Sequence, residues 1–218
     1  MDIVLTSDNS HTLYNETVGE HYHSTFGAIQ ESEHIFIEAG LKYVSENKDE
    51  INILEIGLGT GLNSFLSLKF AIENDLTIDY LGIEAFPIEM EDAKKLNYPA
   101  NLGMEKEMFL EIHKPTNEII KIGNKFSLQK KLVKLQETEL PLENFDLVFF
   151  DAFSPDAQPE LWTEEVFAKI FNSMKTGGVL TTYSCKGIVK RALRSVGFKI
   201  KRLPGPPGKR EFLRAEKI

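Results

Sequence analysis

A short apolar segment that runs into three closely spaced glycines constrains the fold of this chain more than any other feature. The segment INILEIG, Ile51–Gly57, is typical of a buried strand, and Leu62–Asn74 has the length and periodicity of a helix. Between them lie Gly57, Gly59 and Gly61, in a turn whose backbone angles a Cβ would obstruct. Such a strand, turn and helix predict an α/β fold that binds a ligand at the carboxyl edge of its sheet.

The alternation of strands and helices continues along the chain. Further strands are predicted over LTIDYLGIEA, EIIKIG, KFSLQKKLVKLQ, FDLVFFD and GVLTTYS, and further helices over Ser32–Asn47, Pro87–Leu96, Glu160–Met174 and Gly187–Val196. Gly177 and Gly178 are expected to stop the helix before GVLTTYS. The last two strands, FKIKRL and KREFLRAE, are joined by PGPPG. We therefore predict a doubly wound, mostly parallel sheet with helices on both faces and an antiparallel C-terminal hairpin at one edge.

The length and the cysteine content limit the organisation of the protein. A chain of 218 residues is expected to form a single domain. The only cysteine, Cys185, excludes an intramolecular disulfide framework and a zinc site built from several thiolates, which favours a reducing compartment. The N-terminus has no basic leader, and no apolar run approaches the ~18 residues of a membrane span. We therefore expect a cytoplasmic protein without a membrane partner.

The glycine turn and an acidic residue in the next strand predict a nucleotide-like ligand. Glu84 lies 23 residues after Gly61, where a carboxylate can accept hydrogen bonds from both hydroxyls of an adenosine ribose. An NAD-type GxGxxG would need a glycine in place of Leu62, so a dehydrogenase is the weaker interpretation, and a P-loop is excluded. Alternatively, the glycines only make a tight turn and Glu84 is a solvated strand end. Together, Glu55, the glycines and Glu84 resemble the cofactor site of class I S-adenosylmethionine-dependent methyltransferases, which have a Rossmann-like fold.

The loop Asp151–Pro155, DAFSP, carries the strongest signal for chemistry. An apolar strand delivers Asp151 to the edge where the ligand is expected, and the proline stiffens the loop that follows. In methyl transfer, most of the catalysis comes from placing the acceptor lone pair against the methyl carbon. Because the ordinary pKa of aspartate is about 3.9, Asp151 is predicted mainly to orient an acceptor amine and to stabilise the cation that forms. Alternatively, Asp151 caps the following helix.

Four segments together resemble the methyltransferase family that completes the wobble uridine of certain tRNAs: FDLVFFDAFSPDAQPELWT, EIGLGTGLN, STFGAIQESEHIF and LPGPPGKREFLRA. Members convert 5-aminomethyl-2-thiouridine at position 34 into 5-methylaminomethyl-2-thiouridine. The resemblance implies S-adenosylmethionine as cofactor and the anticodon region of tRNA as partner. The site residues expected from the motifs are Glu55, Gly57, Gly59, Gly61, Asn63 and Glu84 for the cofactor, Asp151 for the acceptor amine, and Phe153, Pro155, Lys209 and Arg210 for the substrate.

The resemblance also bears on domain organisation. Residues 1–50 are expected to form a lid and a helix packed on a methyltransferase domain of residues 51–218, with Phe26 and Glu31 near the cofactor. Some family members are fused to an FAD-dependent oxidase, for which this sequence leaves no room, so another enzyme would supply the aminomethyl group. Gln136 and Glu137 follow the third strand without a clear register for contacting the adenine.

The charge distribution decides whether RNA is a reasonable partner. A formal net charge of −8 argues against nucleic acid, because phosphate binding relies on lysine and arginine. However, residues 183–218 contain eleven lysines and arginines and only two glutamates, whereas residues 1–182 contain 14 basic and 31 acidic residues. We therefore expect RNA to approach from the C-terminal side, with Lys209 and Arg210 nearest the acceptor. The alternative is a solvated helix face and hairpin.

Several smaller features have two interpretations. His21, His23 and His34 lie near Glu31 and Glu33, but surface or substrate-lining histidines are favoured over a metal site. Trp162 is favoured as a core residue over a base-stacking one, and Tyr183 suits the crevice and the core equally. For the whole chain, the alternatives to a tRNA methyltransferase are a small-molecule N-methyltransferase and a tRNA-binding module without catalysis.

Overall fold

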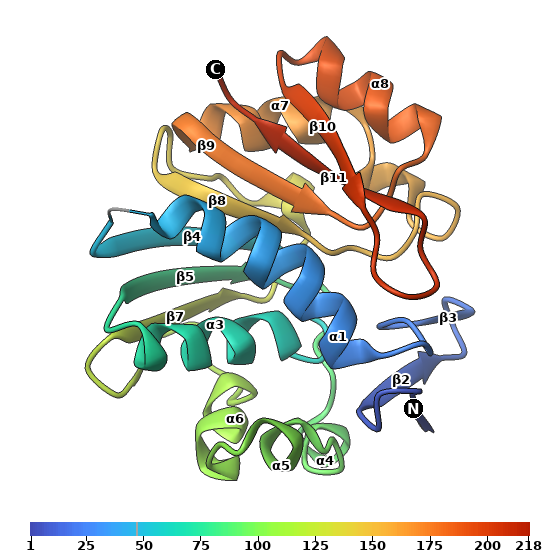
Figure 1. The fold of residues 1–218 in the computed structure, drawn as a ribbon, viewed down its shortest axis with the longest axis vertical. Helices are drawn as coiled ribbons and strands as arrows, with labels where there is room; N and C mark the ends of the chain where they lie inside the picture. The colour runs from blue at the N-terminus through green and yellow to red at the C-terminus, as the bar shows by residue number, and fades with distance from the viewer. Residues whose placement is uncertain (47) are drawn as a thin grey trace.

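The centre of the molecule is an eight-stranded sheet, visible in Figure 1 as strands that cross the whole molecule. The computed structural model describes residues 1–46 and 48–218. The strands of this sheet are β4 (Glu50–Ile56), β5 (Thr77–Ile83), β6 (Ile120–Ile122), β7 (Phe126–Lys131), β8 (Phe145–Phe150), β9 (Met174–Thr182), β10 (Lys199–Pro204) and β11 (Glu211–Glu216). Their order is β10-β11-β9-β8-β4-β5-β7-β6, parallel from β9 to β7 and antiparallel elsewhere. The predicted mostly parallel sheet with a C-terminal edge hairpin is confirmed.

Helices cover both faces of this sheet. The helices are α1 (Ala28–Ser32), η1 (Glu33–Lys42), α2 (Tyr43–Ser45), α3 (Leu62–Glu73), α4 (Met90–Ala93), α5 (Tyr98–Leu102), α6 (Lys106–Ile112), η2 (Leu135–Glu137), η3 (Pro159–Leu161), α7 (Glu164–Ser173) and α8 (Gly187–Ser195). Along β4, Ile51 and Ile53 pack with side chains of η1 and α3, whereas Leu54 and Ile56 pack with those of α7 and α8. Alternate residues of the central strands are thus buried on opposite faces, which explains their continuous apolar sequence.

The order of the strands places a ligand crevice at β4. From β4 the chain winds outward through β5 and β7 in one direction, and through β8 and β9 in the other. The loops that leave neighbouring strands in opposite directions open a crevice at their carboxyl ends. There the Gly57 N–H donates to the carbonyl of Ile83 (3.0 Å), and the Asp151 N–H donates to the carbonyl of Ile56 (2.9 Å). The ends of β4, β5 and β8 are therefore tied together by backbone hydrogen bonds.

The N-terminal region forms a small sheet that precedes the first helix. Strands β1 (Asp2–Leu5), β2 (His11–Asn15) and β3 (Glu20–His21) pair antiparallel in chain order. A continuous helical segment follows, from α1 through the π-helix η1 to α2. It begins at Ala28, four residues before the predicted helix, and Asn47, where the prediction ended, lies outside the described residues.

Two predicted helices are wrong in extent. The helix expected over Pro87–Leu96 is only α4, a single turn. The helix expected over Glu160–Met174 is a 3-10 turn, η3, followed by α7, whose first turn is capped by the Thr163 hydroxyl accepting from the Val166 N–H. The helix ends at Ser173, and Gly177 and Gly178 lie inside β9, where the register with β8 shifts. The two glycines therefore permit an irregularity in a strand rather than stopping a helix. Across the described residues no helix is long and apolar enough to span a membrane.

Candidate active site

A cavity of about 1240 Å³ lies at the carboxyl ends of β4, β5 and β8. Its walls come from segments far apart in the chain, which are residues 15–26, 56–59, 83–86, 133–137, 151–154 and 208–209. The glycine turn and the DAFSP loop, which the sequence singled out separately, therefore face one shared space.

Two glycines of the turn pack so closely against neighbouring segments that a Cβ would not fit. Gly57 has φ +85°, and a Cβ on it would lie 2.7 Å from the carbonyl oxygen of Asp151. Gly59 has φ +49°, and a Cβ there would lie 2.9 Å from the Tyr22 ring. Both glycines line the cavity. An L side chain at Gly57 would therefore have to displace the backbone of the DAFSP loop.

Glu84, just after β5, holds the glycine turn and lines the cavity. One carboxylate oxygen accepts from the Gly59 N–H (2.9 Å), and the other accepts from the Phe86 N–H (2.8 Å). A carboxylate has about four acceptor positions, so two of them remain for a ligand. Glu84 can therefore accept hydrogen bonds from two further donors in the cavity.

Asp151 lies directly after β8 in the cavity wall, half-buried. Its Oδ2 accepts a hydrogen bond from the Asn63 amide (2.8 Å). Burial raises the pKa of Asp151 to about 7, and the nearby Glu31 carboxylate also raises it, whereas the Asn63 hydrogen bond and the Lys209 charge lower it. The ordinary aspartate pKa used in the sequence argument therefore does not apply, and Asp151 can exchange a proton near neutral pH.

Glu55 lies underneath this wall and is fully buried. It accepts hydrogen bonds from the Asn63 amide (2.9 Å) and the Tyr80 hydroxyl (2.8 Å). Burial raises the pKa of Glu55 well above its ordinary value. Because Asn63 donates to both Glu55 and Asp151, Glu55 positions the amide that holds Asp151.

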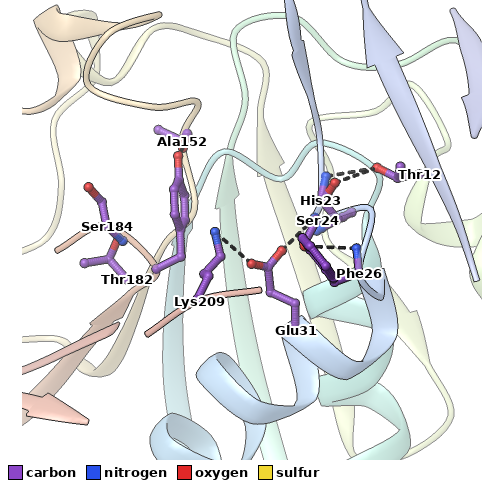
Figure 2. A network of polar contacts seen from close by, with 10 residues as sticks. Thr12, His23, Ser24, Phe26, Glu31, Ala152, Thr182, Ser184 and Lys209 are labelled. Atoms are coloured by element: carbon purple, nitrogen blue, oxygen red, sulfur yellow. Dashed lines mark hydrogen bonds and ion pairs between the residues drawn. The ribbon is translucent and has the colours of Figure 1, made fainter. Parts of the chain in front are cut away.

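The N-terminal segment and the loop between β10 and β11 meet over the acceptor side of the cavity, as Figure 2 shows. Glu31, at the start of the long helix, is only 7% exposed and accepts from the Ser24 N–H (2.8 Å). Its Oε1 lies 3.0 Å from the ammonium nitrogen of Lys209, in the hairpin loop. This ion pair joins two segments separated by more than 170 residues.

Lys209 also connects this ion pair to the DAFSP loop. Its ammonium nitrogen lies 4.6 Å from the centre of the Tyr183 ring. The Tyr183 hydroxyl donates to the carbonyl of Ala152 (2.9 Å), which is the residue after Asp151. The acceptor side of the cavity is therefore enclosed by a continuous series of polar contacts from α1 through the hairpin loop to the end of β8.

Residues 104–218, more than half of the chain, match the model of a family described as S-adenosyl-L-methionine-dependent methyltransferase. The chain belongs to this family. S-adenosylmethionine is thus the cofactor of this methyltransferase, and the doubly wound sheet has the class I methyltransferase arrangement.

Several curated relatives of the methyltransferase carry the name tRNA 5-methylaminomethyl-2-thiouridine biosynthesis bifunctional protein MnmC. The protein from Cupriavidus metallidurans is 28% identical over 217 residues, which cover 94% of this chain and 32% of the relative. That from Campylobacter concisus is 30% identical over 206 residues, which cover 91% of this chain and 33% of the relative. The methyltransferase therefore spans about a third of the length of these relatives.

Solved structures support the same relationship. The crystal structure of MNMC2 from Aquifex aeolicus is 29% identical, with a TM-score of 0.81, covering all of this methyltransferase and 70% of that chain. Spermidine synthase from Thermotoga maritima is 15% identical, with a TM-score of 0.57, covering 99% of this chain and 71% of that chain. The second likeness concerns the fold alone.

The structure divides the site residues predicted from the sequence of this methyltransferase into two groups. Those that line the cavity are Gly57, Gly59, Glu84, Asp151, Phe153 and Lys209. Those outside the set of lining residues are Glu55, Gly61, Asn63, Pro155 and Arg210. Glu55, Asn63 and Pro155 are buried, whereas Arg210 is exposed on the hairpin loop. Gly61 precedes α3 with φ +73°, and a Cβ there would lie 3.0 Å from the ring of His113.

The positions of Trp162, Tyr183 and His23 bear on the alternative roles that the sequence left open for the aromatic residues and the histidines. Trp162 is 1% exposed and donates its indole N–H to the carbonyl of Phe153 (2.8 Å), so it is a core residue and the base-stacking interpretation is wrong. Tyr183 lines the cavity and also packs against Trp162, with ring centres 6.1 Å apart. His23 lies 2.7 Å from the Thr60 hydroxyl, and burial lowers its pKa to about 4. Residues 1–46 and 48–218 contain no group of three or more side chains placed to hold a metal.

Two parts of the wall were missed by sequence reasoning. Glu20, in β3, accepts from the Ser154 N–H (3.0 Å) and from the Ser154 hydroxyl, and so joins the N-terminal sheet to the DAFSP loop. Tyr22 packs edge-on against Phe153, with ring centres 4.9 Å apart. β3 has only two residues and no periodicity, so its sequence carries no strand signal.

Gln136 and Glu137, which had no clear register in the sequence, also line the cavity.

Proposed function

We propose that this methyltransferase transfers a methyl group to the exocyclic amine of 5-aminomethyl-2-thiouridine at tRNA position 34, giving 5-methylaminomethyl-2-thiouridine. The observation that carries this proposal is the position of Asp151, a carboxylate with a pKa near 7 in the same cavity as the glycine turn and Glu84. The names of the relatives supply the substrate class. The aminomethyl group of this substrate must itself be introduced into the uridine by an earlier reaction.

The cofactor side fits S-adenosylmethionine. Gly57 and Gly59 let a ligand approach the main chain, and the free acceptor positions of Glu84 suit the ribose hydroxyls. Gln136 and Glu137, on the wall formed by residues 133–137, are the candidates for contacting the adenine. When bound, S-adenosylmethionine supplies a methyl group on a positively charged sulfur.

Asp151 has two roles in this proposal. An alkylammonium cannot attack, because its lone pair is occupied by a proton. A carboxylate with a pKa near 7 can accept that proton and then hold the neutral amine by its N–H. Because the Asp151 carbonyl packs against Gly57, the acceptor loop stands at a fixed distance from the glycine turn. This supports catalysis by positioning, the main effect in an in-line displacement.

The C-terminal basic residues provide a surface for RNA, with two exceptions. Arg191, Arg194, Lys199, Lys201, Arg202 and Arg210 are exposed on α8, β10 and the hairpin loop. By contrast, the Arg214 guanidinium lies 3.5 Å from the centre of the Tyr43 ring, and Lys217 is buried and donates to the Met174 carbonyl. Arg214 and Lys217 are therefore not available to RNA, and we assign phosphate contacts to the exposed group.

Nucleoside mass spectrometry tests the proposed function. The purified protein, S-adenosylmethionine and tRNA carrying aminomethylated wobble uridine should yield the methylaminomethyl nucleoside, and a strain lacking the protein should accumulate the aminomethyl form. Binding of this tRNA should weaken steeply with salt, because counterions are released from its phosphates. The proposal would be contradicted if the purified reaction yielded no methylaminomethyl nucleoside and the strain lacking the protein did not accumulate the aminomethyl form. A salt-independent reaction with a free amine would favour the small-molecule alternative.

A further inference from the structure

Glu31 is a second carboxylate at the acceptor side of the cavity. It lines the cavity, and its Oε2 is occupied by the Ser24 N–H. Its Oε1 is buried and pairs with the Lys209 ammonium at 3.0 Å, yet no donor among the described residues makes a well-aligned hydrogen bond to it. Figure 2 shows the Glu31 carboxylate between Ser24 and Lys209, and its buried Oε1 keeps acceptor capacity in the wall of the cavity.

Glu31 and Asp151 line the same cavity, and the charge of one acts on the other. Glu31 contributes to the raised pKa of Asp151, second only to burial, and Lys209 acts in the opposite direction on the same group. The charged groups gathered around the acceptor position are thus Asp151, Glu31 and Lys209, with Tyr183 beneath Lys209. Two carboxylates and one ammonium form a site with excess negative charge, which favours a cationic ligand.

A neutral primary amine has two N–H groups and one lone pair. If both N–H groups are bound, the direction of the lone pair is fixed. We propose that Glu31 is a substrate-binding residue that, together with Asp151, accepts the two N–H groups of the acceptor amine and so aims its lone pair at the methyl donor. Lys209 is then the counterion of Glu31 before the substrate enters. This inference rests on the proposed function.

The proton and electron balance follows from this arrangement. The substrate enters as an alkylammonium and gives one proton to the Asp151 carboxylate. The N–C bond forms as the C–S bond breaks, and the electron pair of the C–S bond stays on sulfur. The product is a secondary ammonium with two N–H groups, which the Glu31 carboxylate and the carbonyl oxygen of protonated Asp151 can accept. Asp151 then releases its proton to solvent before the next cycle.

The test is Glu31→Gln, which keeps the size of the side chain and an acceptor for the Ser24 N–H but removes the charge. Its kcat/KM on tRNA with aminomethylated wobble uridine should fall about 10- to 100-fold, as expected for a hydrogen bond to a charged partner. The dissociation constant for S-adenosylmethionine should stay within about twofold. Glu33→Gln is the matched control, because Glu33 is exposed on the same helical segment and does not line the cavity, and it should change neither value.

An amine-binding measurement separates this inference from the proposed function. With S-adenosylhomocysteine present, an NMR titration with the nucleosides 5-aminomethyluridine and uridine should show a preference for the amine in the wild type that is lost in Glu31→Gln. If tRNA is methylated equally well by both proteins, the proposed function stands and the role of Glu31 is overturned. If the amine preference depends on Glu31 but no tRNA is methylated, the amine site stands and the RNA substrate is wrong. Equal amine binding by both proteins also overturns the inference.

Discussion

The two sides of the cavity are built in opposite ways. The glycine turn and Glu84 of the cofactor side come from one continuous unit, β4 to Glu84, which depends on backbone groups such as the Gly59 N–H bound to Glu84. The acceptor side is assembled from four separate segments, and depends on the side-chain charges of Glu31, Asp151 and Lys209. The cofactor side should therefore be sensitive to added atoms, and the acceptor side to changes in charge.

The largest expected effect concerns charge on the acceptor side. Asp151→Asn should lower turnover about 100- to 10,000-fold, the usual contribution of a general base, while S-adenosylmethionine affinity changes little. Single-turnover kinetics and calorimetric titration measure the two quantities. Asp156→Asn, in the same loop but exposed and paired only with Lys186, is the control and should keep full turnover. If Asp151→Asn also lost affinity for S-adenosylmethionine, the cofactor side and the acceptor side would not act independently.

On the cofactor side, a single added carbon should be destabilising. Gly57→Ala places a Cβ against the Asp151 carbonyl, whereas Gly103→Ala, at φ +64°, meets nothing within 4 Å. Gly103→Ala should therefore lower the free energy of unfolding by about 1–2 kcal/mol, from backbone strain alone. Gly57→Ala should lower it further, by up to about 4 kcal/mol in all, and weaken cofactor binding. Urea denaturation gives both values, and equal losses would show that the contact with the DAFSP loop contributes nothing.

A smaller effect is expected outside the cavity, where charge acts on RNA. Arg210→Glu should weaken tRNA binding about 3- to 10-fold at moderate salt and reduce the salt slope by about one. Lys121→Glu makes the same charge change in β6, at the opposite edge of the sheet, and should leave both values unchanged. Filter binding across a salt series measures them. If both variants lose affinity equally, RNA does not approach from the C-terminal side.

The smallest expected effect is a shift in pH dependence. Because the folded pKa of Asp151 is about 7, turnover should rise as pH increases through 7 and level off above it. Removing the Lys209 charge, which lowers that pKa, should move the midpoint upward by several tenths of a pH unit in Lys209→Met. Lys121→Met is the control. A downward or absent shift would show that Lys209 does not act on Asp151.

The same contrast explains what could be predicted from the sequence. The glycine turn, Glu84 and the strand before Asp151 were predicted because each is a contiguous pattern with a known periodicity or spacing. The N-terminal sheet was missed since β3 is two residues long, and its contact through Glu20 depends entirely on tertiary structure. Gly177 and Gly178 were misassigned because a glycine pair is equally compatible with a helix end and with an irregular strand.

Charge patterns were informative only in part. The sequence singled out Lys209, which lines the cavity, but not its ion pair with Glu31, because the two residues are brought together only by the fold. Likewise, the number of basic residues in the C-terminal segment could not reveal that Arg214 and Lys217 are buried and pack on aromatic rings. The raised pKa of Asp151 could not be predicted from the sequence either, because residue type sets only its ordinary pKa and the raised value comes from burial in the fold.

The buried indole of Trp162 makes the acceptor loop observable by spectroscopy. Trp162 is the only tryptophan of the chain, and its N–H is bound to the carbonyl of Phe153, two residues beyond Asp151. The tryptophan fluorescence of the protein, selectively excited at a wavelength where its tyrosines absorb little, therefore originates from one chromophore attached to the loop that holds the acceptor. Any ligand that displaces this loop will change the emission without an added label, so that stopped-flow mixing can time the loop's response to substrate separately from the chemical step.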